Sequence, residues 1–332
     1  KKTVIITGAG SCVPYGMPTG KMLKRSILGS LMDGGFIELK NLSSKVWQSD
    51  SYLEHIEYPN EEIVRFILNR YDYKLMDDFA RRFSESGQTS IDAFLKHNLN
   101  YLEIGKLSII LNILLFEKYA KHQIIDSRKD HWLEYIWNQI NDSEQSILDS
   151  NLAFVTFNYD RVIEHYFESV IRNSFQLDKK DEKDLFNSIP IVHVYGKIAN
   201  LPSVQNKPPN IRFGEFDERI FNELTSDSLD IVYDNTEENQ NLKDTHVLIS
   251  NADRILILGF GYHELNMQRL VLEKSKAARN GSIYGSCMGF NSNEQKKLTN
   301  KYPFLKLFEL NNLEFLREVM ILDDVKRQVR IY

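Results

Sequence analysis

Three short segments of this chain contain residue types that can bind or react with a ligand, and each comes at the end of an apolar run. They are Gly8-Ala9-Gly10-Ser11-Cys12, Thr156-Phe157-Asn158-Tyr159-Asp160 and His193-Val194-Tyr195-Gly196. A glycine turn lets backbone N–H groups approach a phosphate, because no Cβ blocks the approach. An asparagine amide both donates and accepts hydrogen bonds, and a histidine exchanges a proton near neutral pH. The segments therefore predict an anion-binding turn beside groups suited to acid–base chemistry.

The first segment follows the apolar run 3–7 and precedes a helical pattern over 21–31. It does not meet the dehydrogenase pattern G-x-G-x-x-G, because Val13 stands at the third glycine position. Together with Gly16 and Pro18 it resembles the opening motif of sirtuins, GAG-x-S-x-x-x-G-I-P. Cys12 replaces the sirtuin serine, and the Phe-Arg that usually follows is absent. The alternative interpretation is a tight strand-to-helix turn without a ligand.

The other two segments carry the same resemblance. The second resembles the sirtuin T-Q-N-x-D, with Phe157 in place of glutamine. Where sirtuins have His-Gly, this chain has Tyr195 before the glycine and His193 two residues earlier. Residues two apart in a strand point to the same face, so either His193 or Tyr195 could fill the usual histidine site. The chain is similar, more narrowly, to bacterial sirtuin-like effectors of phage defence that hydrolyse NAD.

Two further segments are similar to that bacterial branch, namely Gly259-Phe260-Gly261-Tyr262-His263 and the helical pattern 90–95. The resemblance implies that NAD is the substrate and that Asn158 holds the nicotinamide ribose and positions a water. It also implies catalytic roles for His193, Asp160 and Tyr195. The residues expected to bind NAD are Gly8, Ala9, Gly10, Ser11, Cys12, Pro18, Thr156, Phe157, Gly259, Phe260, Gly261 and Ser286.

Each of these assignments has a purely structural alternative. Asn158 could cap the helix that follows it, unless Asp160 takes that place. His193 could be a core histidine hydrogen-bonded to the backbone. Gly259 and Gly261 could serve only the packing of a strand against a helix.

The elements expected to position these residues form an α/β fold, with a Rossmann-like doubly wound parallel sheet. Strands are predicted at 3–7, 152–156, 189–194, 254–258, 281–284 and 305–307. The long interval before the second strand reads as helical, including one long helix that begins after Thr89-Ser90 and another capped by Asp130. We therefore expect an NAD-binding domain over 1–20 and 150–332, with a helical insertion over 21–149.

Composition narrows the function further. The net charge is −5 and no basic run is longer than two residues, which argues against direct binding of nucleic acid. The apolar stretch 107–116 is too short to span a bilayer. Cys12 and Cys287 are the only cysteines, which indicates a cytoplasmic protein and excludes the four-cysteine zinc site of deacetylating sirtuins. We expect no metal.

The sequence thus predicts an NAD⁺ glycohydrolase that releases nicotinamide and ADP-ribose, or a cyclised product. The resemblance implies an effector that depletes NAD⁺, controlled by homo-oligomerisation or by a partner ATPase of the HerA type. One alternative is a module that senses NAD or ADP-ribose without turnover. A second is an NAD-dependent protein deacylase.

Overall fold

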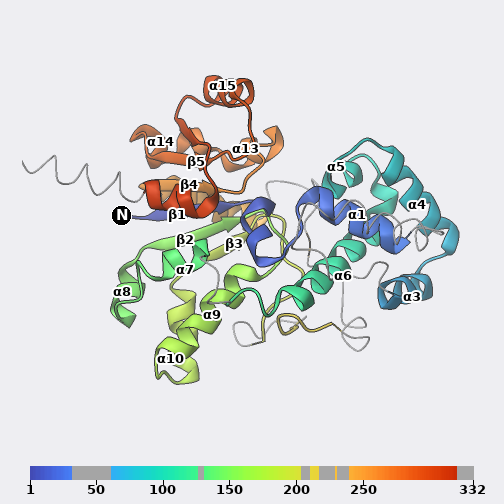
Figure 1. The fold of residues 1–332 in the computed structure, drawn as a ribbon, viewed down its shortest axis with the longest axis horizontal. Helices are drawn as coiled ribbons and strands as arrows, with labels where there is room; N and C mark the ends of the chain where they lie inside the picture. The colour runs from blue at the N-terminus through green and yellow to red at the C-terminus, as the bar shows by residue number, and fades with distance from the viewer. Residues whose placement is uncertain (32–60, 126–130, 203–209, 217–228, 230–238, 320–332) are drawn as a thin grey trace, which may run out of the picture.

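The computed structural model describes residues 1–31, 61–125, 131–202, 210–216, 229 and 239–319. Its centre is a six-stranded parallel sheet with the order β3-β2-β1-β4-β5-β6 (Figure 1). The strands are β1 (Thr3–Thr7), β2 (Leu152–Thr156), β3 (Ile191–His193), β4 (Arg254–Leu258), β5 (Ile283–Ser286) and β6 (Leu305–Phe308). This is the strand order of dinucleotide-binding folds, with a switch point between the first and fourth strands. The predicted Rossmann-like doubly wound sheet is confirmed.

β1 lies at the middle of the sheet and pairs in parallel with both β2 and β4. All five of its residues are buried. Strands covered by helices on both faces read as continuous apolar runs, and the sequence TVIIT meets that requirement. The glycine turn after β1 is therefore carried on the most deeply buried element of the sheet.

Helices form the rest of the described fold. Those before β2 are α1 (Gly20–Leu31), α3 (Glu61–Arg70), α4 (Tyr73–Glu85), α5 (Ile91–Leu95), α6 (Leu102–Ala120), α7 (Trp132–Trp137) and α8 (Glu144–Asp149). Those after β2 are α9 (Val162–Ser174), α10 (Lys179–Asn187), α12 (Gln240–Asn251), α13 (Glu264–Leu270), α14 (Lys276–Arg279) and α15 (Ser292–Lys301). Short 3-10 turns are η1 (Ala9–Ser11), η2 (Val13–Tyr15), η4 (Leu99–Tyr101) and η6 (Leu272–Lys274).

The helices before β2 divide into two groups. Helices α1 and α3–α6 gather beside the sheet, whereas α7 and α8 lie with α9 and α10 next to β2 (Figure 1). The ring of Trp132 lies 6.4 Å from that of Phe154 in β2, and Trp137 meets Phe167 of α9 at the same centroid distance. The large helical insertion between β1 and β2 is confirmed, and α7 packs it against the sheet through Trp132.

The long helix predicted after Ser90 is two helices. Ser90 does cap a helix, since its hydroxyl accepts the Ala93 N–H, but α5 ends at Leu95. The chain then turns, and α6 begins only at Leu102. Helix α6 is apolar and long enough to cross a membrane, yet it is mostly buried among the other helices, as expected of a core helix. Asp130, the predicted cap of the next helix, lies outside the described residues.

The outer strands differ from the prediction at their ends. β3 covers only 191–193 of the predicted 189–194, because Val194 and Tyr195 form a turn closed by a hydrogen bond from the Gly196 N–H to the His193 carbonyl. β5 lies two residues later than predicted, and β6 is one residue longer. β1, β2 and β4 have the predicted bounds.

Candidate functional site

The switch point between β1 and β4 is built from three glycines. Backbone passes so closely here that a Cβ on Gly8 would lie 2.7 Å from the Gly259 carbonyl oxygen, and one on Gly10 would lie 2.9 Å from it. Gly259 has a φ of +54°, and its Cβ would lie 2.0 Å from the Ser11 nitrogen. Because only glycine fits at these positions, the loops after β1 and β4 meet backbone against backbone.

Four backbone N–H groups of this turn, those of Gly8, Gly10, Ser11 and Cys12, already have acceptors. Gly8 donates to the Leu258 carbonyl at 3.0 Å and Gly10 to the Gly259 carbonyl at 2.9 Å. Ser11 and Cys12 donate within the turn, to Gly8 and Ala9. A pyrophosphate bound by these N–H groups would therefore replace hydrogen bonds that the protein makes to itself.

Asn158 lies two residues beyond β2, directly beside this turn. Its backbone N–H donates to the Thr156 hydroxyl at 3.1 Å, and its Nδ2 donates to the Cys12 Sγ at 3.2 Å. Its Oδ1 is buried and accepts no hydrogen bond from any described residue. A buried acceptor without a donor is unfavourable by about 1–3 kcal/mol, so this atom is suited to accept a hydrogen bond from a ligand.

The alternative function of Asn158 as a helix cap does not hold. The Asp160 carboxylate accepts the first free N–H of α9, that of Val162, at 3.1 Å. The pKa of Asp160 is raised to about 7. Burial is the main cause and Glu117 adds to it, whereas the hydrogen bond from the Val162 N–H acts in the opposite direction. Asp160 thus combines a capping position with a carboxyl group that titrates near neutral pH.

Cys12 fills space beside these groups. Its side chain is completely buried, and burial raises the pKa of its thiol well above the ordinary value, with a further increase from Asp160. A reactive cysteine needs a lowered pKa and access to solvent. Cys12 is therefore a small packing residue under Asn158.

His193 and Tyr195 face different neighbours, because the strand ends at His193 and the period-two argument does not reach Tyr195. Both ring nitrogens of His193 are engaged, Nδ1 with the Asn158 carbonyl and Nε2 with the Glu164 carboxylate, each at 2.8 Å. Glu164 also accepts the Lys197 ammonium at 3.0 Å. His193 is thus packed behind the Asn158 backbone.

Tyr195 belongs to a group of aromatic rings at the carboxyl edge of the sheet. The Phe157 ring lies 5.5 Å from Tyr195 and 5.1 Å from Phe260, so residues following β2, β3 and β4 meet. The Tyr195 hydroxyl donates to the Asn266 Oδ1 at 2.5 Å, and the Arg269 guanidinium lies 4.8 Å from the centre of its ring. Tyr195 is thus the member of the third segment that reaches across the edge.

The loop after β4 contacts the end of β5 through neutral groups. The Gly259 N–H donates to the Ser286 hydroxyl at 3.3 Å, and the Tyr262 hydroxyl donates to the Ser286 carbonyl at 2.9 Å. Gly261 lies further out, against the His263 ring, and Pro18 is buried just before α1. Ser286 and Gly259 are therefore adjoining parts of one site.

Sequence reasoning missed the residues that connect the helical insertion to these loops. Glu117 of α6 accepts the Arg161 backbone N–H at 3.0 Å and forms a 2.5 Å ion pair with its guanidinium, and both side chains are fully buried. The Tyr159 hydroxyl donates to Asp92 of α5. The Trp132 indole N–H donates to the Ser11 carbonyl at 2.8 Å. The partners are distant in sequence. The only local signal was the charged pair Glu117-Lys118 near the end of the apolar helix α6.

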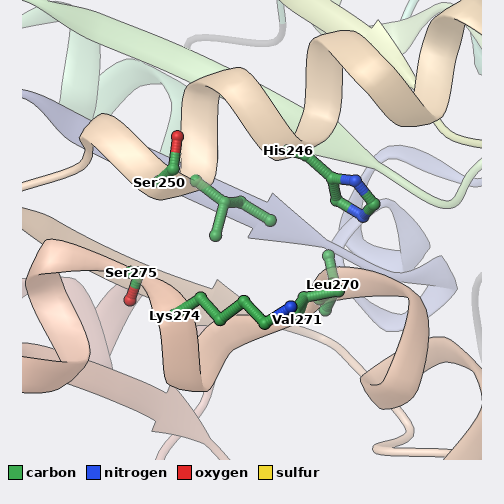
Figure 2. A pocket seen from close by; sticks show the side chains of 7 residues that line it. His246, Ser250, Leu270, Val271, Lys274 and Ser275 are labelled. Carbon is green, nitrogen blue, oxygen red and sulfur yellow. The ribbon is translucent and has the colours of Figure 1, made fainter.

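One cavity lies apart from this site, between α12 and the segment from α13 to η6 (Figure 2). Its volume is about 210 Å³. It is lined by His246, Ile249, Ser250, Leu270, Val271, Lys274 and Ser275. None of these residues lies in the loop that directly follows a strand. The described residues also contain no cluster of three or more His, Cys, Asp or Glu side chains that could hold a metal ion.

Comparison with known proteins adds a similarity in structure. Neither models of protein families nor curated proteins gave a match to the chain. Ten chains among solved structures do match. One is described as a Sir2 histidine-to-tyrosine mutant with a p53 peptide and NAD. It is 13% identical, with a TM-score of 0.33, and the match covers 97% of this chain and 93% of that chain. The assignment of a Rossmann-like fold rests on the strand order.

Proposed function

We propose that this protein is an NAD⁺ glycohydrolase. The observation that carries the proposal is the Asn158 amide, which lies beside the glycine turn at the carboxyl edge with a buried Oδ1 that no described donor reaches. Three loops at this edge resemble sirtuin motifs, and sirtuins use NAD. Strand order supports a dinucleotide at the switch point.

The reaction breaks the bond between ribose C1′ and the nicotinamide nitrogen. The bonding electrons go to the pyridinium ring, so nicotinamide leaves as a neutral molecule. Water supplies the new C1′–O bond and loses a proton, or a ribose or adenine atom attacks instead to give a cyclised product. Asn158 would accept a ribose hydroxyl at Oδ1. A neutral amide suits this place, since it adds no charge next to the developing oxocarbenium ion.

The other assigned residues surround that reaction. Gly8, Gly10 and Gly259 would let the pyrophosphate approach backbone, and Ser286 lies on the side where adenosine would extend. Tyr195 reaches across the edge from the third loop. Asp160, with a pKa of about 7, supplies a carboxyl group within the same buried cluster.

The resemblance to bacterial defence proteins supports a role in depleting NAD⁺ during phage infection. Control would pass through the helical insertion, for which we propose the bounds 21–149. Three of its helices bind the loops that carry Ser11, Tyr159 and Arg161. A second copy of the chain or a HerA-type ATPase acting on this insertion could therefore alter the site.

The test is nicotinamide release from NAD⁺ by the purified chain, alone and with bacterial or phage-infected lysate. Asn158→Ala should lower the rate by at least about 100-fold while melting remains as in wild type. Asn187→Ala, at the exposed last residue of α10, is the matched control. Full activity in Asn158→Ala would exclude the assigned site.

A sensor of NAD or ADP-ribose is the second candidate. It is favoured by His193, whose two ring nitrogens are both engaged with protein groups, Asn158 and Glu164. Tight NAD binding with no release of nicotinamide in any lysate would support this candidate over the hydrolase.

A further inference from the structure

The two hydrogen bonds of His193 determine where its protons are. A backbone carbonyl oxygen can only accept, so Nδ1 donates to Asn158 at 2.8 Å. The carboxylate of Glu164 also accepts, so Nε2 donates at 2.8 Å. Both ring nitrogens therefore carry hydrogen, and neither offers a lone pair to a substrate or a water.

The surroundings keep Glu164 in the ionised form that this arrangement needs. Burial alone would raise the pKa of Glu164, but the charges and hydrogen bonds of His193 and Lys197 lower it below its ordinary value. The side chains of His193 and Glu164 are 4% and 3% exposed. A buried carboxylate with two cationic partners is a stable arrangement, and removing one partner is costly.

The position of this ion pair links it to Asn158. Glu164 lies in the first turn of α9, and His193 is the last residue of β3. His193 hydrogen-bonds the backbone carbonyl of Asn158, whose side chain donates to Cys12. The ion pair thus fixes the backbone of Asn158 with respect to the helix that follows.

We propose that His193 is a positioning residue, which ties the Asn158 backbone to Glu164 and Lys197, and is not the base that takes a proton from the attacking nucleophile. This inference rests on the proposed NAD⁺ hydrolysis for its functional consequence. Its structural content, a histidine that donates from both ring nitrogens, stands by itself. Tyr195 and Asp160 are then the remaining titratable residues of the second and third segments that were assigned a catalytic role.

The first experiment needs no activity. Full-length chain labelled with ¹⁵N-histidine is examined by NMR at pH 7, and the His193 signals are assigned from their loss in His193→Gln. Two protonated ring nitrogens are expected. A ring nitrogen without hydrogen would overturn the proposal, whether or not the chain hydrolyses NAD⁺.

The second experiment separates a positioning residue from a base. His193→Gln retains an amide whose two N–H groups can donate, whereas His193→Phe retains none. We expect kcat of His193→Gln within about tenfold of wild type, and a loss of at least about 100-fold in His193→Phe. The pH profile of kcat/KM should have the same acidic limb in His193→Gln as in wild type.

A His193→Gln variant that melts like wild type but is as inactive as His193→Phe would overturn the proposal. The same holds if its acidic limb disappears. If wild type releases no nicotinamide in any condition, the proposed function fails and the NMR result alone decides this inference. Should His193→Phe not fold, Lys197→Met weakens the same ion pair at its partly exposed end, and kcat should fall with little change in KM.

Discussion

The two halves of the carboxyl edge are held together by different forces. On the β2–β3 side, buried charges do this work: Glu117 with Arg161, and Glu164 with His193 and Lys197. On the β4–β5 side, the loops meet through neutral groups, with glycine backbone against glycine backbone and the Tyr262 hydroxyl on a carbonyl. Both halves meet at the turn after β1.

The difference fits two tasks within one proposed site. Charged networks fix a few polar atoms in place, and burial beside them raises the pKa of Asp160 to about 7. Close glycine packing brings neither a side chain nor a charge to the edge. The charged half therefore suits the reacting ribose, and the glycine half suits the rest of the dinucleotide.

The largest expected effect is on the charged half. Arg161→Met leaves Glu117 buried without its cation and should lower the free energy of unfolding by about 4 kcal/mol. The double variant Arg161→Met with Glu117→Leu should recover much of this loss, because no buried charge remains. Chemical denaturation measures both. Equal stability of the single and double variants would contradict the assignment of an ion pair.

The stability of the β4–β5 half, which rests on glycine contacts, should fall when a side chain adds volume there. Gly259→Ala adds a Cβ at 2.0 Å from the Ser11 nitrogen, at a φ of +54°. Strain and overpacking together predict a loss of about 3 kcal/mol. Gly289→Ala is the control, since it also has a positive φ but nothing within 4 Å of its Cβ. A similar loss in both variants would show that conformation, and not close approach, determines the effect.

The smallest expected effect concerns pH. The Asp160 pKa is raised from 3.8 to about 7 in the folded chain, so folding favours its protonated form. Its contribution to stability is complete below about pH 4 and is lost as the pH rises to about 7. Asp160→Asn keeps an acceptor for the Val162 N–H without this dependence. Relative to wild type, it should gain roughly 2–3 kcal/mol between pH 5 and 8, as followed by thermal melts.

An opposite trend, with wild type gaining stability over Asp160→Asn as the pH rises, would mean that Asp160 is ionised in the folded chain. The charged half would then hold a further negative charge beside Asn158, and the contrast between the two halves would be greater.

The sequence predicted what depends on local pattern. β1, β2 and β4 are apolar runs bounded by polar residues or glycine, and their bounds agree with the structure. The end of β3 did not follow, because the β-favouring residues Val194 and Tyr195 continue the pattern of the strand, and only Gly196 after them, with a φ of +73°, indicates the turn. The break between α5 and α6 was hidden because Leu95, Leu99 and Leu102 keep helical spacing across it, although Asn98 and Asn100 between them favour a turn.

The sequence predicted which residues form the candidate site better than it predicted how they are held in place. Asn158, the glycine turn and Gly259 meet at one edge, as the parallel topology requires. Glu164 and Arg161 were overlooked, because a charged residue in the first turn of a helix reads as exposed. Their burial depends on partners 29 and 44 positions away in sequence, and pairing over such distances leaves no local trace.

The contact between Gly10 and Gly259 has a consequence for the order in which the protein is made. Synthesis from the N-terminus produces the glycine turn early and β4 only after most of the chain. The insertion helices make contacts close in sequence and can fold first, whereas parallel pairing of β1 must wait for β2 and β4. Until then the turn has neither its hydrogen-bond acceptor nor its opposite wall, so a nascent chain that has not reached β4 cannot form the site.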